Sequence, residues 1–401
     1  MVNLDISCQI DIVKENAVDV ISQEEIIDKL KKSLKDKKPL KLKIGFDPTA
    51  RDIHLGHTVI LRKLRKLQDL GHIVYFIIGD FTAKIGDPSG RTILRPILSD
   101  KEISDNALTY TEQAFKILDK KKTKIIYNSI WYKNMNLSQF LSLLSSYTIA
   151  RILERDDFSQ RMKEGKPLSM LEVVYPLIQG YDSCKMEADI EFGGTDQKFN
   201  LLVGRNTQQT FNQPPQAVVT MPLLVGLDGK NKMSKSLNNY VGITESSKNM
   251  FGKIMSIPDN IMWDYFRLLT EVDLDDVKKM HPKEAKMLLA HTIVLQYHSP
   301  KIGDREKEEF QRVFSNKELP AQMPVYKSDN VQINLIDVLF SMKVVASRNE
   351  ARRIITQGGI SLIDVDDSSC VKGVSEQVVD IPAKGAVLKI GKKKFLKIVR
   401  L

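Results

Sequence analysis

Two histidines three residues apart are the first side chains with evident chemistry. They stand in the stretch GFDPTARDIHLGH, residues 45–57. In the first turn of a helix, this spacing puts both rings on one face, where free N–H groups and the helix dipole favour an anion. His54 and His57 could hydrogen-bond a phosphate oxygen, with Thr49 as a further donor and Gly45 leaving room for a base. Taken alone, the pattern is more often structural, and no third ligand lies at a zinc-like spacing.

A second candidate is the pair of lysines in KMSKS, residues 232–236. The flanking residues are rich in glycine and asparagine and predict a loop. Lys232 and Lys235 on such a loop can close over a triphosphate and neutralise charge on the leaving pyrophosphate. Ser236 follows at once. A bare pair of lysines at this spacing is usually solvated, but the full spelling is far more specific.

The stretch GDPSGR places a carboxylate and an arginine after a predicted strand, and a second arginine follows four residues later. Asp87 could receive an α-ammonium group, and Arg91 and Arg95 could contact phosphates. The alternative is a type I turn with surface arginines.

One predicted helix carries a polar face among apolar residues. Tyr175, Gln179 and Asp182 stand at positions i, i+4 and i+7, which a helix brings to one side. A phenol, an amide and a carboxylate suit a small, polar, aromatic ligand. A carboxylate that accepts a hydrogen bond from a phenol rejects the analogue without the hydroxyl. The alternative is a satisfied buried polar network.

These groups need a scaffold, and the sequence predicts a parallel sheet. Residues 40–46 are a short apolar run, residues 54–70 have apolar positions at helical spacing before Gly71, and residues 73–78 read IVYFII. Strand, helix and strand of this length make a right-handed βαβ unit. Ligands of such sheets bind at the carboxyl ends of the strands, where GFDPT and GDFTAKIGDPSGR stand.

The remaining residues divide the chain further. Residues 218–224 read as another strand, and Ser347 with Glu350 makes a capping box before a short helix and strands. We expect an α/β domain over 1–243 with a helical insertion over about 100–190, a helical domain over 244–317, a linker over 318–330 and an α+β domain over 331–401.

The composition favours a globular protein with an anionic partner. The 401 residues are 42% hydrophobic and 27% charged, with a net charge of +10. Residues 331–401 hold twelve Lys and Arg against seven Asp and Glu, so half of that net charge lies there. Cys8, Cys184 and Cys370 are too scattered for a disulfide framework or a metal pair. We find no transmembrane run, signal core or transit peptide and expect a cytoplasmic protein without a membrane partner.

Together these motifs resemble the bacterial tyrosyl-tRNA synthetases, which are class I aminoacyl-tRNA synthetases. HLGH at 54–57 is similar to the HIGH signature, KMSKS matches the second signature, and GFDPT, IGDPSG, QGYD and GGTDQKFN also agree. The resemblance covers essentially the whole chain. It implies a Rossmann-type catalytic domain split by a helical insertion, an α-helical tRNA-binding domain and a C-terminal S4-like RNA-binding domain.

The resemblance also implies the family's two reactions. Tyrosine and ATP would give tyrosyl-adenylate and pyrophosphate, and the tyrosine would pass to the 3′-terminal adenosine of tRNA(Tyr). Mg²⁺ would accompany ATP, with no metal held by the protein itself. The helical insertion would form a homodimer interface.

Roles of single residues follow from the same resemblance. Catalysis would involve Thr49, His54, His57, Arg91, Arg95, Lys232 and Lys235. The ATP site would comprise Gly45, Asp47, His54, His57, Gly194, Asp196, Lys235 and Ser236. Tyrosine would be bound by Lys43, Thr82, Asp87, Tyr175, Gln179, Asp182 and Gln197, with Asp182 accepting the phenol hydroxyl.

Lys43 departs from the family pattern, because many members carry a tyrosine at that position. A lysine could donate to the phenol oxygen of the substrate, with Asp182 as the candidate partner for its charge. Two other readings stay open, a tryptophanyl-tRNA synthetase and a synthetase-like RNA-binding protein without catalysis. Asp182 and the S4-like ending argue against the first, and the intact HLGH and KMSKS argue against the second.

Overall fold

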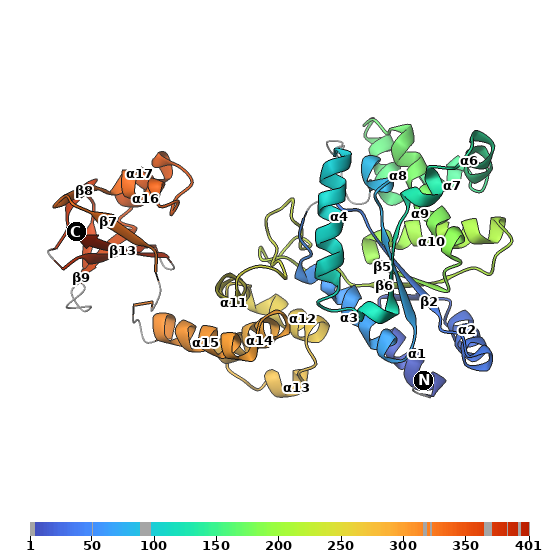
Figure 1. Cartoon of the computed structure of the whole chain (residues 1–401), viewed down its shortest axis with the longest axis horizontal. Helices are drawn as coiled ribbons and strands as arrows, with labels where there is room; N and C mark the ends of the chain where they lie inside the picture. The colour runs from blue at the N-terminus through green and yellow to red at the C-terminus, as the bar shows by residue number, and fades with distance from the viewer. Residues whose placement is uncertain are drawn as a thin grey trace. The chain divides into compact units, whose positions relative to one another are not determined.

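The computed structural model describes most of the chain, which forms two compact units (Figure 1). The described residues are 5–49, 51–88, 98–315, 319–320, 323–364, 371–382, 384–391 and 394–400. The first unit spans Met1–Gly303 and the second spans Asp304–Leu401.

A six-stranded sheet forms the centre of the first unit. Its order is β1-β6-β5-β2-β3-β4, and only β1 runs antiparallel to its neighbour. The strands are β1 (Asp19–Ile21), β2 (Lys41–Phe46), β3 (Ile73–Ile78), β4 (Thr123–Tyr127), β5 (Ile190–Gly194) and β6 (Ala217–Met221). All of β5 and β6 is buried, as expected for parallel strands covered on both faces. The predicted parallel-sheet fold is confirmed.

The predicted strand–helix–strand unit lies at the middle of this sheet. Helix α3 (Leu55–Asp69) connects β2 to its parallel neighbour β3. Its buried side chains recur at helical spacing, and Gly71 follows its end with φ +103°, a conformation that favours glycine. The unit therefore sets the carboxyl ends of β2 and β3 beside the start of α3.

The segment 100–190 is mostly helical, but it also contains β4, which pairs in parallel with β3 at the sheet edge. The prediction missed β4 because its residues are exposed or half-buried and show no continuous apolar run. The helices of this segment are α4 (Asp100–Ala114), α5 (Ser129–Tyr132), α6 (Leu137–Leu144), α7 (Ile149–Leu153), α8 (Asp156–Lys163) and α9 (Met170–Met186).

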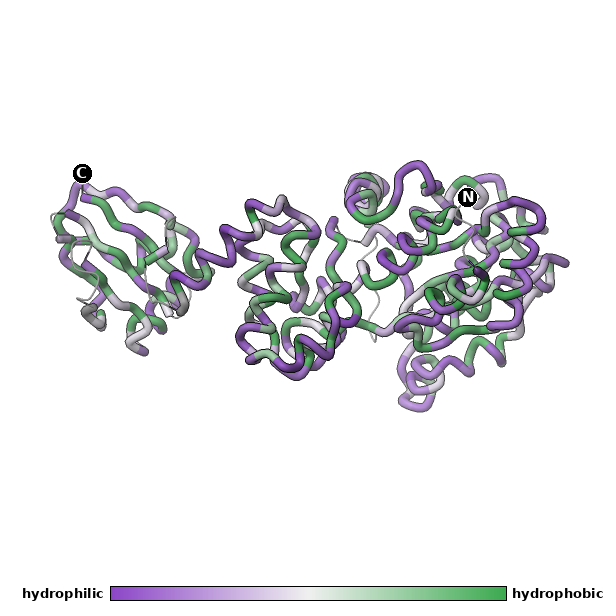
Figure 2. Tube along the Cα trace, turned by 90° about the horizontal axis from the view of Figure 1, so that it is seen from below, coloured by the Kyte–Doolittle hydropathy of each residue, from purple (hydrophilic) through white to green (hydrophobic). Residues whose placement is uncertain are grey.

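Other helices complete the first unit, and hydrophobic and hydrophilic residues alternate along many of them (Figure 2). They are α1 (Ile6–Lys14), α2 (Gln23–Asp36), α10 (Lys198–Thr210), α11 (Ser247–Met255), α12 (Asp259–Leu269), α13 (Leu274–Val277) and α14 (Pro282–Tyr297). Helices α9 and α10 pack against each other, and α12 contacts α3. Ser22 caps α2 by accepting from the N–H of Glu25. No described helix is long and apolar enough to cross a membrane.

The second unit begins within α15 (Pro300–Phe310) and contains a five-stranded sheet of order β10-β9-β12-β13-β7. Its elements are β7 (Val325–Ser328), β8 (Gln332–Asn334), α16 (Leu335–Ser341), α17 (Arg348–Thr356), β9 (Ile360–Asp364), β10 (Val371–Val374), β11 (Val378–Asp380), β12 (Ala386–Ile390) and β13 (Lys394–Arg400). Strand β7 falls inside the expected linker 318–330, yet it pairs with β13. The expected linker therefore includes part of the second unit, because a short edge strand whose partner lies 72 positions away leaves little local signal in the sequence.

Candidate active site

The two signature histidines stack on each other at the start of α3. His54 is the N-cap residue and His57 the third residue of the helix. Their ring centroids lie 3.8 Å apart with the planes at 26°. The backbone N–H of His54 donates to Nδ1 of His57 at 3.2 Å. Nδ1 of His54 is buried and has no hydrogen-bond partner among the described residues.

Both imidazoles are neutral near pH 7. Burial, followed by the nearby Lys235 ammonium, lowers the pKa of His54 to about 3. Burial, followed by its neighbour His54, lowers the pKa of His57 well below its ordinary value. A neutral imidazole carries one N–H donor, so this pair can act on a phosphate through hydrogen bonds rather than through charge.

Asp47, directly after β2, connects residues predicted for both substrates. Its Oδ1 accepts from the Thr82 hydroxyl at 2.6 Å, and its Oδ2 accepts from the Tyr175 hydroxyl at 2.9 Å. Gly79, directly after β3, makes this approach possible, since a Cβ there would lie 2.0 Å from Asp47 Oδ1 and 2.2 Å from Thr82 Oγ1. Gly79 is a further site residue that the sequence analysis did not single out.

Asp182 is a buried carboxylate on α9 that accepts three hydrogen bonds. The donors are Asn128 Nδ2 at 3.2 Å, Trp131 Nε1 at 2.9 Å and the Tyr132 hydroxyl at 2.8 Å. Burial raises the pKa of Asp182 to about 6, although Lys43 and these donors act in the opposite direction. The carboxylate is thus ionised at neutral pH and held by neutral donors.

Asn128, Trp131 and Tyr132 were missed by the sequence analysis. They follow β4, whose carboxyl end lies at the same edge of the sheet as those of β2 and β3. Because β4 lacks a clear strand pattern, the residues after it were not considered. Asn128 also donates to Thr82 Oγ1 at 3.1 Å, so it joins the Asp182 cluster to the Asp47 cluster.

A third group of hydrogen bonds involves Asp87 and Gln197, two of the residues predicted to bind tyrosine. Gln197 donates through Nε2 to Asp87 Oδ2 at 2.7 Å, and its Oε1 accepts from Asn200 at 3.0 Å. The side-chain oxygen of Gln179 is buried and has no hydrogen-bond partner among the described residues. An unpaired buried acceptor is costly, so this oxygen is suited to a donor from a ligand.

Lys43 does not behave as predicted. Its ammonium lies 2.7 Å from Glu191 Oε1, 2.7 Å from Ser183 Oγ and 3.2 Å from the Gln179 carbonyl. The ion-pair partner is therefore Glu191 and not Asp182. An ammonium has three donors, and these three acceptors use all of them. Lys43 and Glu191 are each 1% exposed, so the pair supports α9 from within the core.

The two signature lysines contact different segments near the carboxyl ends of the strands. Lys232 Nζ lies 2.5 Å from Asp196, in the turn after β5. Lys235 Nζ donates to the Asp52 carbonyl at 2.5 Å and to the Tyr110 hydroxyl at 2.8 Å, over the ring of that tyrosine. The loop thus reaches from the end of β5 to the segment just before His54.

Backbone hydrogen bonds fix the exit of the lysine loop beside the histidines. The N–H of Leu55 donates to the Val241 carbonyl at 3.0 Å, and the N–H of Ile243 donates to the Ile53 carbonyl at 3.0 Å. The two signatures, far apart in sequence, are therefore neighbours in space. Ser236 is exposed on this loop and shares a hydrogen bond with Ser234 at 2.8 Å.

The other predicted residues lie near the same strand ends. Gly45 has open space where a Cβ would stand, which leaves room above β2. The N–H of Thr49 donates to the Asp47 carbonyl at 2.7 Å, forming a tight turn after that strand. Gly194 ends β5, and a Cβ there would lie 2.7 Å from Asp196 Oδ1. The predicted Arg91 and Arg95 lie outside the described residues.

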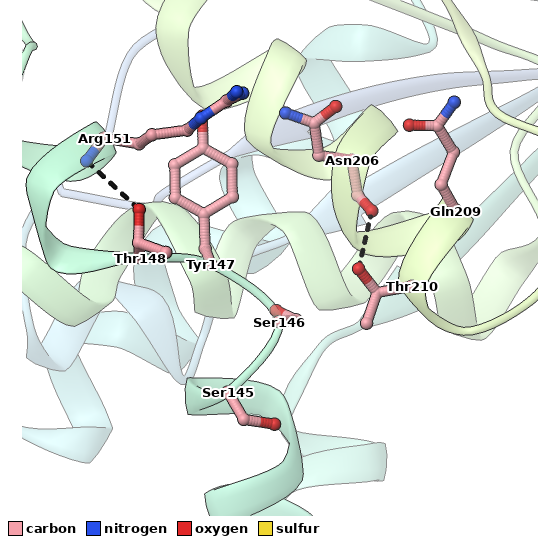
Figure 3. A pocket seen from close by; sticks show the side chains of 8 residues that line it. All are labelled: Ser145, Ser146, Tyr147, Thr148, Arg151, Asn206, Gln209 and Thr210. Carbon is pink, nitrogen blue, oxygen red and sulfur yellow. Dashed lines mark hydrogen bonds between the residues drawn. The ribbon is translucent and has the colours of Figure 1, made fainter.

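A separate surface pocket of about 260 Å³ lies where the α6–α7 connection meets the end of α10 (Figure 3). Its walls are mostly hydroxyls and amides, and the lining residues are Ser145, Ser146, Tyr147, Thr148, Arg151, Asn206, Gln209 and Thr210. None of them is a predicted site residue.

Comparisons with known proteins agree with this geometry. A family model described as tRNA synthetases class I (W and Y) matches residues 35–315. A second model, described as the tyrosine–tRNA ligase SYY-like C-terminal domain, matches residues 316–398. The tyrosine–tRNA ligase of Aquifex aeolicus is 48% identical over 396 residues and covers 98% of each chain. That of Thermotoga maritima is 45% identical and covers 97% of each.

Solved structures show the same fold at lower identity. A tyrosyl-tRNA synthetase of Archaeoglobus fulgidus, solved with L-tyrosine, has a TM-score of 0.59 at 21% identity and covers 76% of this chain and 100% of that one. A C-terminally truncated mitochondrial enzyme of Aspergillus nidulans has a TM-score of 0.63 at 20% identity and covers 76% and 94%. Neither the tryptophan enzyme nor an inactive RNA-binding protein is favoured. The chain belongs to the tyrosine–tRNA ligases, which are class I aminoacyl-tRNA synthetases.

Proposed function

We propose that tyrosine is activated at the carboxyl ends of β2, β3 and β5. The observation that carries this proposal is the meeting of the two signatures, since the end of the lysine loop bonds to the backbone on both sides of His54 and Lys235 Nζ donates to the Asp52 carbonyl. As a class I synthetase, the enzyme uses ATP, tyrosine and tRNA. The assignment of single residues below rests on their contacts and on the family resemblance.

Asp182 receives the phenol hydroxyl of tyrosine. It already accepts three hydrogen bonds, but an ionised carboxylate has four acceptor positions, so one remains for the substrate. At the other end, Asp87, Tyr175 and Gln179 bind the ammonium group, with the buried Gln179 oxygen as an acceptor. Gln197 holds Asp87, and Thr82 holds Asp47, so both position their neighbours.

ATP lies over the ends of β2 and β5. Gly45 leaves room for it, Asp47 and Asp196 line the pocket, and Gly194 allows the close turn after β5. The lysine loop contributes Lys232, Lys235 and Ser236 on the pyrophosphate side. Arg91 and Arg95 are also assigned to the pyrophosphate side, on the basis of the sequence alone.

In the first step, a carboxylate oxygen of tyrosine attacks the α-phosphorus, and the bond to the bridging oxygen of pyrophosphate breaks. Thr49, His54 and His57 donate hydrogen bonds to the α-phosphate oxygens as their charge changes. Lys232 and Lys235 compensate the charge of the leaving pyrophosphate. In the second step, a hydroxyl of the terminal adenosine of tRNA(Tyr) takes the tyrosyl group and releases AMP. Both steps depend on positioning and charge, without a covalent enzyme intermediate.

Mg²⁺ enters with ATP in this proposal. The described residues include no group of three His, Cys, Asp or Glu side chains that could hold a metal ion. Mg²⁺ usually binds through substrate phosphates and a few carboxylates, and the proposal attributes no step to the ion.

In this proposal the tRNA also contacts two domains other than the catalytic one. We assign 1–243 to catalysis, 244–317 to a helical tRNA-binding domain, and β7 together with 331–401 to an S4-like RNA-binding domain. The excess of basic residues in 331–401 suits phosphates. Close relatives are bacterial, and tRNA charging in bacteria takes place in the cytoplasm, where we place this enzyme.

The helical insertion is proposed as a homodimer interface. Its large apolar side chains are unusually exposed in the single chain, Leu137 at 72%, Met170 at 70% and Ile130 at 65%. Leu141, Ile149, Met162 and Leu171 are also exposed by more than half. Exposed apolar side chains gathered in one segment are more typical of an interface than of a free surface. Sedimentation of the purified enzyme tests this, and a monomer at micromolar concentration would contradict it.

Tyrosine-dependent exchange of pyrophosphate into ATP tests the active-site assignment. We expect exchange with tyrosine and not with tryptophan, and a loss of at least a hundredfold in kcat for His57→Ala and Lys235→Ala, because each removes transition-state contacts. Normal exchange in both variants would refute the assigned roles, and stimulation by tryptophan alone would refute the assigned substrate.

A further inference from the structure

The side chain of Asn239 lies inside the lysine loop and bonds to both of its arms. Asn239 is 4% exposed. Its Oδ1 accepts from the N–H of Ser234 at 2.8 Å, in the middle of the signature. Its Nδ2 lies 3.2 Å from the Lys232 carbonyl and 3.0 Å from Asp228 Oδ2. One buried amide thus spans the segment that carries both signature lysines.

The backbone and Gly226 complete this arrangement. The carbonyl of Asn239 accepts from the N–H of Leu227 at 2.9 Å, so the residue also closes the loop through its main chain. A Cβ on Gly226 would lie 2.2 Å from Asn239 Nδ2 and 2.4 Å from its Cγ. The Asn239 amide therefore packs directly against Gly226, and the Cβ of any other residue at position 226 would occupy the space that the amide fills.

Asp228 holds the far side of the amide. It also accepts from the backbone N–H groups of Lys230 and Asn231, both at 3.0 Å, and from Asn231 Nδ2 at 2.9 Å. These contacts build a turn in which the carboxylate orientation is fixed before it meets Asn239. The amide consequently has a defined acceptor on one side and the signature backbone on the other.

We propose that Asn239 is a positioning residue for adenylate formation, which sets the spacing of Lys232 and Lys235 by tying the Lys232 carbonyl and the Ser234 N–H to one rigid amide backed by Asp228 and Gly226. The inference rests on the proposed roles of the two lysines. Both ammonium groups must face the same pyrophosphate, and a loop free to spread would align them in only a fraction of its conformations. Asn239 makes no contact with substrate in this scheme.

Asn239→Ala removes the amide, and we expect kcat for tyrosine-dependent exchange to fall about tenfold, the scale of one or two lost hydrogen bonds that act in the transition state. The KM for ATP should rise, while the tyrosine affinity, measured by equilibrium binding, should stay within twofold of the parent. Gly226→Ala, which displaces the amide without deleting it, should show the same pattern. Leu237→Ala, on an exposed side chain of the same loop, is the matched control and should change nothing.

A charge-neutral swap tests the contact with Asp228 directly. Asn239→Asp keeps the acceptor for Ser234 but loses both donated bonds, so it should resemble Asn239→Ala. In the double variant Asp228→Asn/Asn239→Asp, residue 228 can donate to residue 239, and kcat should recover by at least threefold. No recovery would overturn the role of this contact.

Lys235→Ala, measured beside these variants, separates the two proposals. If Lys235→Ala loses exchange while Asn239→Ala and Gly226→Ala stay within twofold of the parent, the inference about Asn239 is wrong and the active-site assignment stands. A parallel fall in tyrosine affinity and melting temperature in Asn239→Ala would also overturn it, because the residue would then support the whole fold. Undiminished exchange in Lys235→Ala would instead contradict the assigned role of that lysine.

Discussion

At the scale of single residues, Asp182 is the titratable group that we propose to recognise the tyrosine hydroxyl. Burial raises its pKa to about 6, so the carboxylate takes up a proton as the pH falls through that value. The two signature histidines do not titrate there, because their pKa values are held far lower. A change in tyrosine binding centred near pH 6 is therefore expected to report Asp182.

Trp131 offers a direct probe of this proton. Its Nε1 donates to Asp182 Oδ1 at 2.9 Å, and the chain has only one other tryptophan, Trp263. In a Trp263→Phe background, the fluorescence of ligand-free enzyme should titrate with a midpoint near pH 6. The tyrosine affinity should weaken below the same pH, since the neutral acid has fewer acceptor positions. Asp182→Asn should abolish the fluorescence transition, and its persistence would assign the midpoint to another group.

The buried Lys43–Glu191 pair makes a second residue-scale prediction. Lys43→Met or Glu191→Met leaves the opposite charge buried without a partner, which costs about 3–5 kcal/mol of stability. The double variant removes both charges and should recover most of that loss. Urea unfolding measures all three. Equal destabilisation by the double variant and by the sum of the singles would show that the two side chains are not coupled.

The chemistry of single residues could be predicted where the residues that act together lie close together in the sequence. The spacing of His54 and His57 was enough to predict a shared face. Lys43 was misjudged because its partner, Glu191, lies on a different strand 148 positions away. Whether Lys43 pairs with Glu191 or with Asp182 depends on how the core packs, which the spacing of residues in the sequence does not predict. The same applies to Gly79, whose need for a missing Cβ appears only once Asp47 and Thr82 meet there.

At the scale of elements, the proposed tyrosine site lies on α9, which packs closely against α10. Gly180 on α9 faces the backbone of α10, where a Cβ would lie 3.1 Å from Gly204 Cα and 3.0 Å from Thr207 Oγ1. Small residues on both helices permit this approach. Gly180 stands between Gln179 and Asp182 in sequence, so the contact fixes the helix that carries both.

Gly180→Ala should therefore force the helices apart. Overpacking costs about 1–3 kcal/mol, and the melting temperature should fall while the KM for tyrosine rises. Gly252→Ala is the matched control, since Gly252 also lies within a helix but has open space around its Cβ position. That variant should be neutral or slightly stabilising. A rise in stability for Gly180→Ala would mean that the helices have room to accommodate the methyl group.

The sequence predicted elements well where apolar residues form a run or recur at helical spacing, and poorly where they do not. The fully or largely buried β2, β3 and β6 and the amphipathic α3 were all predicted. The missed strands β1, β4 and β7 are short edge strands, whereas the missed β5 is central and buried but reads IEFGG, with a glutamate and two glycines instead of an apolar run. An edge strand has one neighbour and one open side, so its residues need not alternate or be continuously apolar. Missing β4 also hid Asn128, Trp131 and Tyr132, which follow it.

At the scale of the whole molecule, the residues proposed for adenylate formation and the excess of basic residues lie in different units. Every residue assigned to adenylate formation lies in the first unit, whereas residues 331–401 carry half of the net charge. The boundary was placed too late in the sequence analysis, because β7 belongs to the sheet of the second unit. The family models meet at residues 315 and 316, which is the better point for a truncation.

A chain ending at residue 315 should retain tyrosine-dependent exchange within about twofold of the parent, because its catalytic core is intact. Charging of tRNA should weaken, chiefly through a higher KM for tRNA. Each lost phosphate contact also removes a salt-dependent contribution, roughly 0.7–0.9 in the slope of log affinity against log salt. The full chain should therefore show a steeper slope than the truncated one, measured by tRNA binding at several salt concentrations.

Loss of exchange on truncation would show that the second unit supports adenylate formation. Equal salt slopes would show that its basic residues do not contact the tRNA backbone.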